Sequence, residues 1–240
     1  MPQLHGYSVT ITSHGREVEH YDVKLENPDT VSCYIVSESG MEFTVQYTDL
    51  QGRRTMKVDV FIDGRMLASK SAEPGKTLSI WGSRTSKTTR STFRFSEITL
   101  VDDDDADGLV TPPSIGSIEV KLYRARIEKC RISSRSHYRR SDPPQTGPVS
   151  EKSKKGGWHQ VSLGRDRRSE WQPSPTRAIR LDPIDAPYAI FRFNYRPRAM
   201  LQAENIIPPL GMLTKLNVEA LQAPVCKRSP SPHIARNLSR

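Results

Sequence analysis

The feature that most constrains this chain is an alternation of apolar and polar residues on either side of a polar break at 37–40. The alternating apolar residues are Val31, Cys33 and Ile35 before the break and Phe43, Val45 and Tyr47 after it. A period of two residues is typical of a β-strand with one buried face, and Gly40 favours a turn between the two runs. We therefore predict a β-hairpin over 31–47, on which the other strands pack.

The same alternation recurs along most of the chain. It predicts strands at 7–12, 18–25, 56–62, 65–69, 77–81, 92–100, 117–127, 158–163 and 188–195. Asp63-Gly64 indicates a tight hairpin between two of these strands, because glycine tolerates a positive φ. Polar segments at 83–91 and 165–177 are predicted loops, and the long strand 117–127 is expected to change neighbours at Leu122-Tyr123.

Many short strands separated by turn residues favour one fold class. They indicate a mainly β protein, an antiparallel β-sandwich of the jelly-roll kind, rather than alternating strands and helices. Pro197 suits the first turn of a helix, so a short helix is predicted at about 198–205. A second helix is predicted at 210–221, which gives one or two short helices near the C-terminal end.

Charge divides the chain into regions. Residues 1–120 carry 12 basic and 18 acidic side chains, whereas 121–168 carry 14 and 4. The stretch 131–157 has almost no large apolar residue, so it cannot offset its ordering entropy. We predict one sandwich domain from 1–130 plus 158–209, a disordered basic insert loop at 131–157, and a 210–240 tail that is partly helical and then disordered and basic.

Cysteine use and the absence of long apolar runs suggest a compartment. The three cysteines, Cys33, Cys130 and Cys226, are far apart and form no CxxC pair, which excludes zinc-ribbon and thioredoxin-like sites. Cys33 occupies an inward strand position and is expected to be a buried free thiol in a reducing compartment. No apolar signal core or 18-residue apolar run occurs, so we expect an intracellular protein of the cytoplasm or nucleus, not secreted and without a membrane span.

Sequence motifs for catalysis or metal binding are lacking. No GxSxG, HExxH or GxxxxGK[ST] motif occurs, and the six histidines are scattered. The acidic run Asp102–Asp107 could bind calcium, yet it lacks the EF-hand pattern and is better interpreted as a solvated loop. We predict no catalytic residue, no cofactor and no metal ligand.

The basic stretch 121–168 is the one distinctive site-like feature. Its candidate polyanion-binding residues are Arg131, Arg135, Arg139, Arg140, Lys152, Lys154, Lys155, Arg165, Arg167 and Arg168. Tyr138 and Trp158 lie among them. Basic side chains neutralise phosphates and aromatic rings stack on exposed bases, so weak, salt-sensitive nucleic-acid binding is one hypothesis. The plainer interpretation is that these charges keep a loop soluble.

Three groups of segments together carry a family resemblance. They are Cys33–Val45, the pair Val60–Gly64 with Gly116–Arg124, and Phe191–Pro209. In order and spacing the chain resembles, over about Gly6–Pro209 without the basic insert, an uncharacterised fungal domain of unknown function. The resemblance implies an intracellular protein with a single β-rich domain and brings no known activity, cofactor or binding residue.

Three functional hypotheses follow, in order of preference. The first is a non-enzymatic interaction or scaffold module that binds a protein partner through loops or an exposed edge strand. The alternative is a polyanion-associated protein that binds nucleic acid through the basic loop 121–168. The third is an enzyme whose active residues lie at scattered strand ends, since a fold does not decide function.

Overall fold

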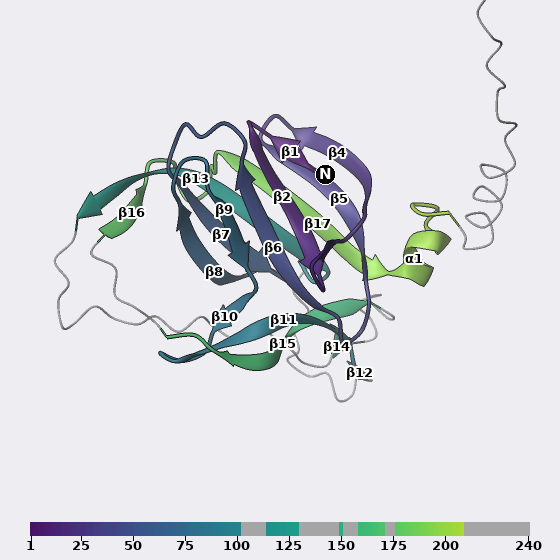
Figure 1. Ribbon diagram of the computed structural model, residues 1–240. Coiled ribbons are helices and arrows are strands. Elements are labelled where there is room, and N and C mark those ends of the chain that lie inside the picture. The colour runs from purple at the N-terminus through teal and green to yellow at the C-terminus, as the bar shows by residue number, and fades with distance from the viewer. Residues whose placement is uncertain (102–113, 130–148, 151–157, 171–175, 209–240) are drawn as a thin grey trace, which may run out of the picture. The chain divides into compact units, whose positions relative to one another are not determined.

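The computed structural model describes residues 1–101, 114–129, 149–150, 158–170 and 176–208 (Figure 1). Residues Met1–Ile207 form one compact unit, and Pro208–Arg240 are grouped as a second. The first unit holds the described strands and the one described helix. The predicted helix at 210–221 and most of the insert 131–157 lie outside the described residues.

Two large sheets make up the first unit (Figure 1). The seven-stranded sheet runs β4 (His20–Asn27), β5 (Thr30–Ser37), β17 (Ala189–Pro197), β13 (Ser117–Lys129), β7 (Met56–Ile62) and β8 (Arg65–Ala72), with β16 (Thr176–Arg180) on β13. The eight-stranded sheet runs β1 (Gln3–Leu4), β2 (Tyr7–Ser13), β6 (Glu42–Asp49), β11 (Thr89–Glu97) and β10 (Gly82–Arg84), with β3 (Arg16–Glu17) on β2, β9 (Thr77–Ile80) on β6 and β15 (His159–Arg168) on β11. A short parallel pair joins β12 (Leu100–Val101) to β14 (Val149–Ser150).

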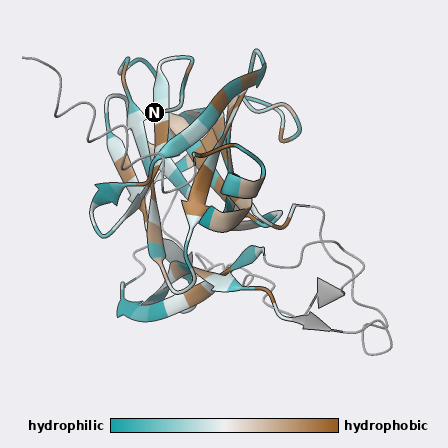
Figure 2. Cartoon of the chain, turned by 90° about the vertical axis from the view of Figure 1, so that its right-hand side faces the viewer, coloured by the Kyte–Doolittle hydropathy of each residue, from teal (hydrophilic) through white to brown (hydrophobic). Residues whose placement is uncertain are grey.

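Side chains from both sheets build one hydrophobic core. It includes Val9, Ile11 and Val45 of the eight-stranded sheet and Val60, Val120 and Phe193 of the seven-stranded sheet. Figure 2 shows hydrophobic stretches along the central strands and hydrophilic residues in many of the connecting turns. The mainly β, sandwich-like fold is therefore confirmed, with one refinement: β17 and β5 run parallel, so the seven-stranded sheet is mixed.

The predicted hairpin over 31–47 is wrong in its pairing, although both strands exist. β5 pairs with β4 and β17 in one sheet, whereas β6 pairs with β2, β9 and β11 in the other. The break at 38–41 crosses between the sheets, and Gly40 N donates to Phe95 O of β11 at 2.8 Å. An arch between two sheets and a hairpin within one sheet bury the same alternating face, so the sequence pattern does not distinguish them.

Several local predictions are confirmed. Asp63-Gly64 turns β7 into β8 with positive φ at both residues. β13 changes neighbours as expected, because Ser117–Leu122 pair with β17 and Ala125–Lys129 pair with β16. A six-residue helix, α1 (Arg198–Ala203), follows Pro197 and packs Leu201 against Val36.

The predicted loops at 83–91 and 165–177 are wrong in part. β10 and the start of β11 occupy the first, and the end of β15 and the start of β16 occupy the second. Polar residues fit these strands because their buried hydroxyls find partners: Ser83 Oγ donates to Leu67 O at 3.1 Å, and Ser91 Oγ bonds Asp166.

A buried carboxylate ties the two sheets together at one end. Asp63 accepts hydrogen bonds from Gly116 N at 2.8 Å, just before β13 of the seven-stranded sheet, and from Val161 N at 3.1 Å in β15 of the other sheet. Tyr195 Oη donates to both carboxylate oxygens at 2.6 and 2.7 Å. Burial first, and then the Asp63 charge, raises the pKa of Tyr195 well above its usual value, so Tyr195 keeps the proton it donates.

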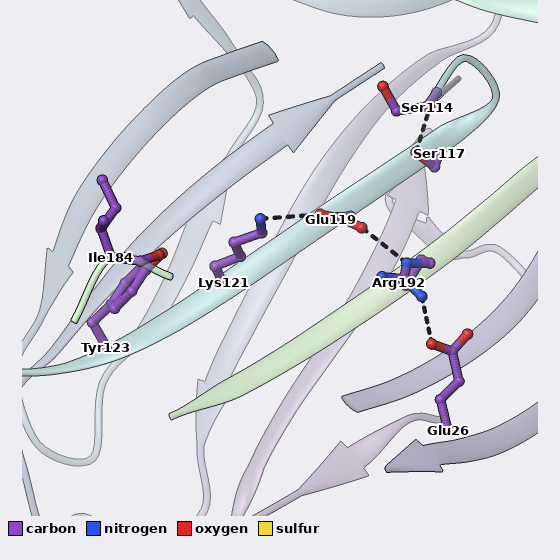
Figure 3. Close-up of polar contacts among 8 residues, drawn as sticks. All are labelled: Glu26, Ser114, Ser117, Glu119, Lys121, Tyr123, Ile184 and Arg192. Atoms are coloured by element: carbon purple, nitrogen blue, oxygen red, sulfur yellow. Dashed lines mark hydrogen bonds and ion pairs between the residues drawn. The ribbon is translucent and has the colours of Figure 1, made fainter. Parts of the chain in front are cut away.

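Charges are matched on the solvent-facing side of the seven-stranded sheet (Figure 3). Arg192 of β17 bonds Glu26 of β4 on one side and lies 2.9 Å from Glu119 of β13 on the other. Lys121 Nζ lies 3.3 Å from Glu119 and over the Phe61 ring at 4.5 Å. Nearby, Arg180 pairs with the fully buried Asp59. Each of these cations therefore has a carboxylate partner.

The His20 imidazole gives this fold a testable pH dependence. Its side chain is 4% exposed and packs on Phe193, with Glu17 Oε1 3.3 Å from Nδ1. Burial first, and then the positive charge of the chain's amino terminus, lowers the His20 pKa from 6.5 to about 4. Since the unfolded chain takes up the proton first, His20 costs about 3 kcal/mol of stability as the pH falls from 6.5 to 4.

Denaturant unfolding at both pH values, on wild type and His20→Gln, measures this effect. Between these pH values the free energy of unfolding should fall by about 3 kcal/mol less in the variant than in the wild type, because glutamine does not titrate. Equal losses for the two chains would show that His20 is not responsible.

Candidate polyanion-binding face

Three arginines lie side by side across the strands β10, β11 and β15. Arg84 and Arg90 are directly opposite each other, and so are Arg90 and Arg167. This row lies on the face of β11 that points away from the core residues Phe93 and Phe95. Like charges directly opposite each other destabilise a sheet. An anion bound beside the row would offset this repulsion.

Trp81, between β9 and β10, lies at the centre of this arrangement. The Arg90 and Arg167 guanidinium carbons are 5.3 and 5.7 Å from the centre of its ring. Lys70 of β8 joins them, donating from Nζ to Ser79 O at 2.8 Å. Burial, followed by the charges of Arg90 and Arg84, lowers the pKa of Lys70, and burial and Arg84 do the same to Arg90. The positive charges of Arg84 and Arg90 therefore disfavour the protonated form of Lys70.

We call Lys70, Arg84, Arg90, Arg94 and Arg167, with Trp81, the cationic face. Within the described ranges, no carboxylate is within ion-pair distance of Lys70, Arg90 or Arg94. Buried Arg90 Nε also has no hydrogen-bond partner there. This contrasts with the outer face of the seven-stranded sheet, where the charges alternate in sign (Figure 3).

In the part of the chain that the structure describes, Glu42 is the acidic side chain that forms an ion pair with this face. Its Oε2 lies 3.2 Å from Arg167, and its Oε1 accepts from Thr92 Oγ1 at 2.9 Å and from Arg165 N at 3.4 Å. Burial pushes its pKa up, but these hydrogen bonds and arginine charges outweigh burial and leave the pKa lowered. Glu42 is therefore ionised near neutral pH and offsets Arg167.

A hollow of about 220 Å³ opens beside the row. Trp81, Arg167, Glu42 and Thr92 form one side of it. The rest of the lining is Thr12, Phe43 and Thr44 of β2 and β6, with His14 and Gly15 of the β2–β3 turn. Such a hollow can hold part of a ligand whose charge rests on the row.

The structure places three of the ten predicted polyanion-binding residues. Arg165, Arg167 and Arg168 lie at the end of β15, and Arg168 pairs with Glu170 at 2.6 Å. The other seven, Arg131, Arg135, Arg139, Arg140, Lys152, Lys154 and Lys155, lie outside the described residues. Four other residues of the cationic face were not predicted, because they are spread over the three strands β8, β10 and β11. They are Lys70, Arg84, Arg90 and Arg94. The one signal was the even spacing of Arg90 and Arg94, which places them on one face of a strand.

A serine and a histidine also meet, but not as a catalytic pair. Ser37 Oγ of β5 lies 2.8 Å from His159 Nδ1 of β15. Both residues are buried, at 2% and 7% exposure, so a substrate cannot reach the hydroxyl. Burial also lowers the pKa of His159. The Ser37–His159 pair therefore joins the two sheets.

The thiol of Cys33 is buried in the core, as the sequence predicts. Burial raises its pKa to about 12, so the thiol is unreactive.

Two further kinds of feature are absent from the described part of the chain, a metal-ligand cluster and a membrane-spanning helix. No three His, Cys, Asp or Glu side chains gather there as metal ligands would. The run Asp102–Asp107 lies outside that part. No helix in the described ranges is long and apolar enough to cross a bilayer.

Comparison with known families gives a match. A family model described as a domain of unknown function, DUF7918, matches residues 6–210. The chain belongs to this family. The match takes in β2 to α1 and so includes the cationic face of this DUF7918 domain. The predicted resemblance to a domain of unknown function is confirmed, whereas fungal origin and intracellular location stay predictions. Neither the curated proteins nor the solved structures that were compared give a match.

Proposed function

We propose that the protein is a non-catalytic binding module that holds the phosphate backbone of a nucleic acid on its cationic face. The observation that carries the proposal is the excess of positive charge around Trp81. Among the described residues, Arg90, Arg167 and Lys70 gather there, and the one carboxylate within ion-pair distance of any of them is Glu42, beside Arg167. Phosphate groups would relieve the repulsion among these side chains and would release condensed counterions.

The hypothesis of a protein partner at an exposed edge strand stays a prediction. β4 is such an edge, with Val23 and Leu25 exposed. However, its pairing with β5 is interrupted twice, and Asp22 has a φ of +50°. Bulges of this kind hinder the addition of another strand. We therefore favour the cationic face as the binding surface.

Neutralising the face tests this proposal. The variant is Lys70→Gln, Arg90→Gln, Arg94→Gln. Its binding of a labelled single-stranded oligonucleotide is measured by fluorescence anisotropy at low salt. We expect the affinity to fall by about tenfold or more, because three phosphate contacts are lost. The matched control is Arg53→Gln, Arg54→Gln, Lys76→Gln, which removes the same charge from exposed loop positions.

The control should bind nearly as tightly as the wild type. If both variants lose affinity equally, net charge alone attracts the oligonucleotide and the cationic face has no special role. If neither wild type nor variants bind at low salt, the protein is not a nucleic-acid-binding module.

A further inference from the structure

We infer that the hollow beside Trp81 receives one unpaired nucleobase, so that the module's partner is single-stranded nucleic acid. This inference rests on the proposed function and specifies its ligand. Arg167 belongs both to the arginine row and to the lining of the hollow. A strand whose phosphates follow the row therefore passes the opening of the hollow.

The size and lining of the hollow suit a single flat ring system. Its volume of about 220 Å³ is below the roughly 300–1,000 Å³ of pockets for drug-sized ligands. The Trp81 indole and the Arg167 guanidinium, 5.7 Å apart, offer planar surfaces of the kind on which bases stack. The Thr44 hydroxyl can donate to or accept from a base edge, whereas the Thr12 and Thr92 hydroxyls, whose protons go to Thr44 O and Glu42, can accept.

The electrostatics separate the base from its phosphate. Ionised Glu42 lines the hollow and repels an anion there, while its carboxylate can accept from a base amino group. The cations Lys70 and Arg90 are absent from the lining of the hollow and lie beyond Trp81. A neutral ring inside and a phosphate outside match this division of charge.

The backbone around the hollow is shaped for close approach. A Cβ on Gly164 would lie 2.4 Å from Thr92 Oγ1 and 3.1 Å from Glu42 Oε1, so only glycine lets β15 close onto that pair. On the opposite rim, His14 and Gly15 both have positive φ, at 49° and 77°. Ser13 Oγ fixes this rim by donating to Glu42 O at 2.7 Å. This is the ordinary geometry of a two-residue turn between paired strands, here β2 and β3, and it sets the edge of the hollow.

A paired base does not fit this arrangement. Entry of a base from a duplex requires unpairing and unstacking, which costs a few kcal/mol. A single strand has already lost its pairing partner. We therefore expect the full-length wild-type chain to bind a single-stranded oligonucleotide about tenfold more tightly than an abasic strand of equal phosphate count, and more tightly than a duplex.

Fluorescence anisotropy with these three probes tests the inference, together with two Trp81 variants. Trp81→Leu should lower affinity for the normal strand about tenfold, to that of the abasic strand, and leave abasic binding nearly unchanged, whereas Trp81→Phe should keep most of the preference. Phe61→Leu is the matched control, because Phe61 is also an aromatic ring beneath a cation, Lys121, on an outer sheet face.

The control should keep the wild-type preference for normal over abasic strand. Equal wild-type affinity for normal strand, abasic strand and duplex would overturn the base subsite but leave phosphate binding in place. Binding of none of the three would overturn the proposed function and this inference together. Since the abasic comparison needs only the wild type, the test does not depend on the folding of any variant.

Discussion

Replacing Asp63 by asparagine is expected to lower the free energy of unfolding by about 3 kcal/mol. The carboxylate is buried and accepts from Gly116 N, Val161 N and the Tyr195 hydroxyl, which lie on three different strands or strand ends. An amide offers one acceptor oxygen and places an NH₂ group against a donor, so at least one buried donor loses its partner at about 1–3 kcal/mol each.

Asparagine tolerates the left-handed backbone of position 63, so the substitution isolates the lost hydrogen bonds from turn strain. The matched control is Asp22→Asn, because Asp22 also has a φ of +50° but lies exposed on β4. Urea denaturation should show a change within about 0.5 kcal/mol for the control. Equal, small effects at both positions would mean that Asp63 does not hold the sheets together.

Replacing Arg180 by methionine is expected to lower the free energy of unfolding by about 3–5 kcal/mol. Asp59 is fully buried, and Arg180 with Ser69 Oγ, at 2.6 Å, satisfies its carboxylate. Arg180 also packs over Tyr123, 4.7 Å from the ring centre. Removing one member of a buried ion pair leaves the other charge uncompensated, which is far costlier than losing a surface pair.

The double variant Asp59→Leu, Arg180→Met should recover most of that loss, because buried ion pairs are often replaceable by apolar side chains. Arg126→Met provides the surface comparison: its pair with Glu128 is exposed and worth about 0–1 kcal/mol. A double variant no more stable than Arg180→Met would show that the cost lies in packing rather than in the buried charge of Asp59.

Much of the fold could be predicted from the sequence, because strand period and turn chemistry are local. The Asp63-Gly64 pair predicts the tight turn between β7 and β8 from local sequence alone. In the same way, the alternation at 188–195 predicts the strand β17. Pairing was less predictable. Whether 31–37 and 43–47 meet each other or opposite sheets depends on partners far along the chain, such as β17 for the first and β2 for the second.

The candidate site was predicted only where its charges are contiguous in sequence. Of the predicted basic residues, Arg167 belongs to the cationic face, and it lies in a contiguous basic stretch with Arg165 and Arg168. Arg84 and Arg90 join Arg167 only through strand register, and Lys70 joins them from the edge of the other sheet. Trp81 gave no signal because a tryptophan between two short strands is usually a core residue.

The salt dependence of oligonucleotide binding tests the central claim most directly. For the full chain and a single-stranded oligonucleotide, the logarithm of the association constant should fall linearly with the logarithm of salt concentration, with a slope of about −3.5 if the five cations each contact a phosphate. The variant Lys70→Gln, Arg90→Gln, Arg94→Gln should reduce the steepness by about 2. An unchanged slope in that variant would contradict the assignment of the cationic face as the binding surface.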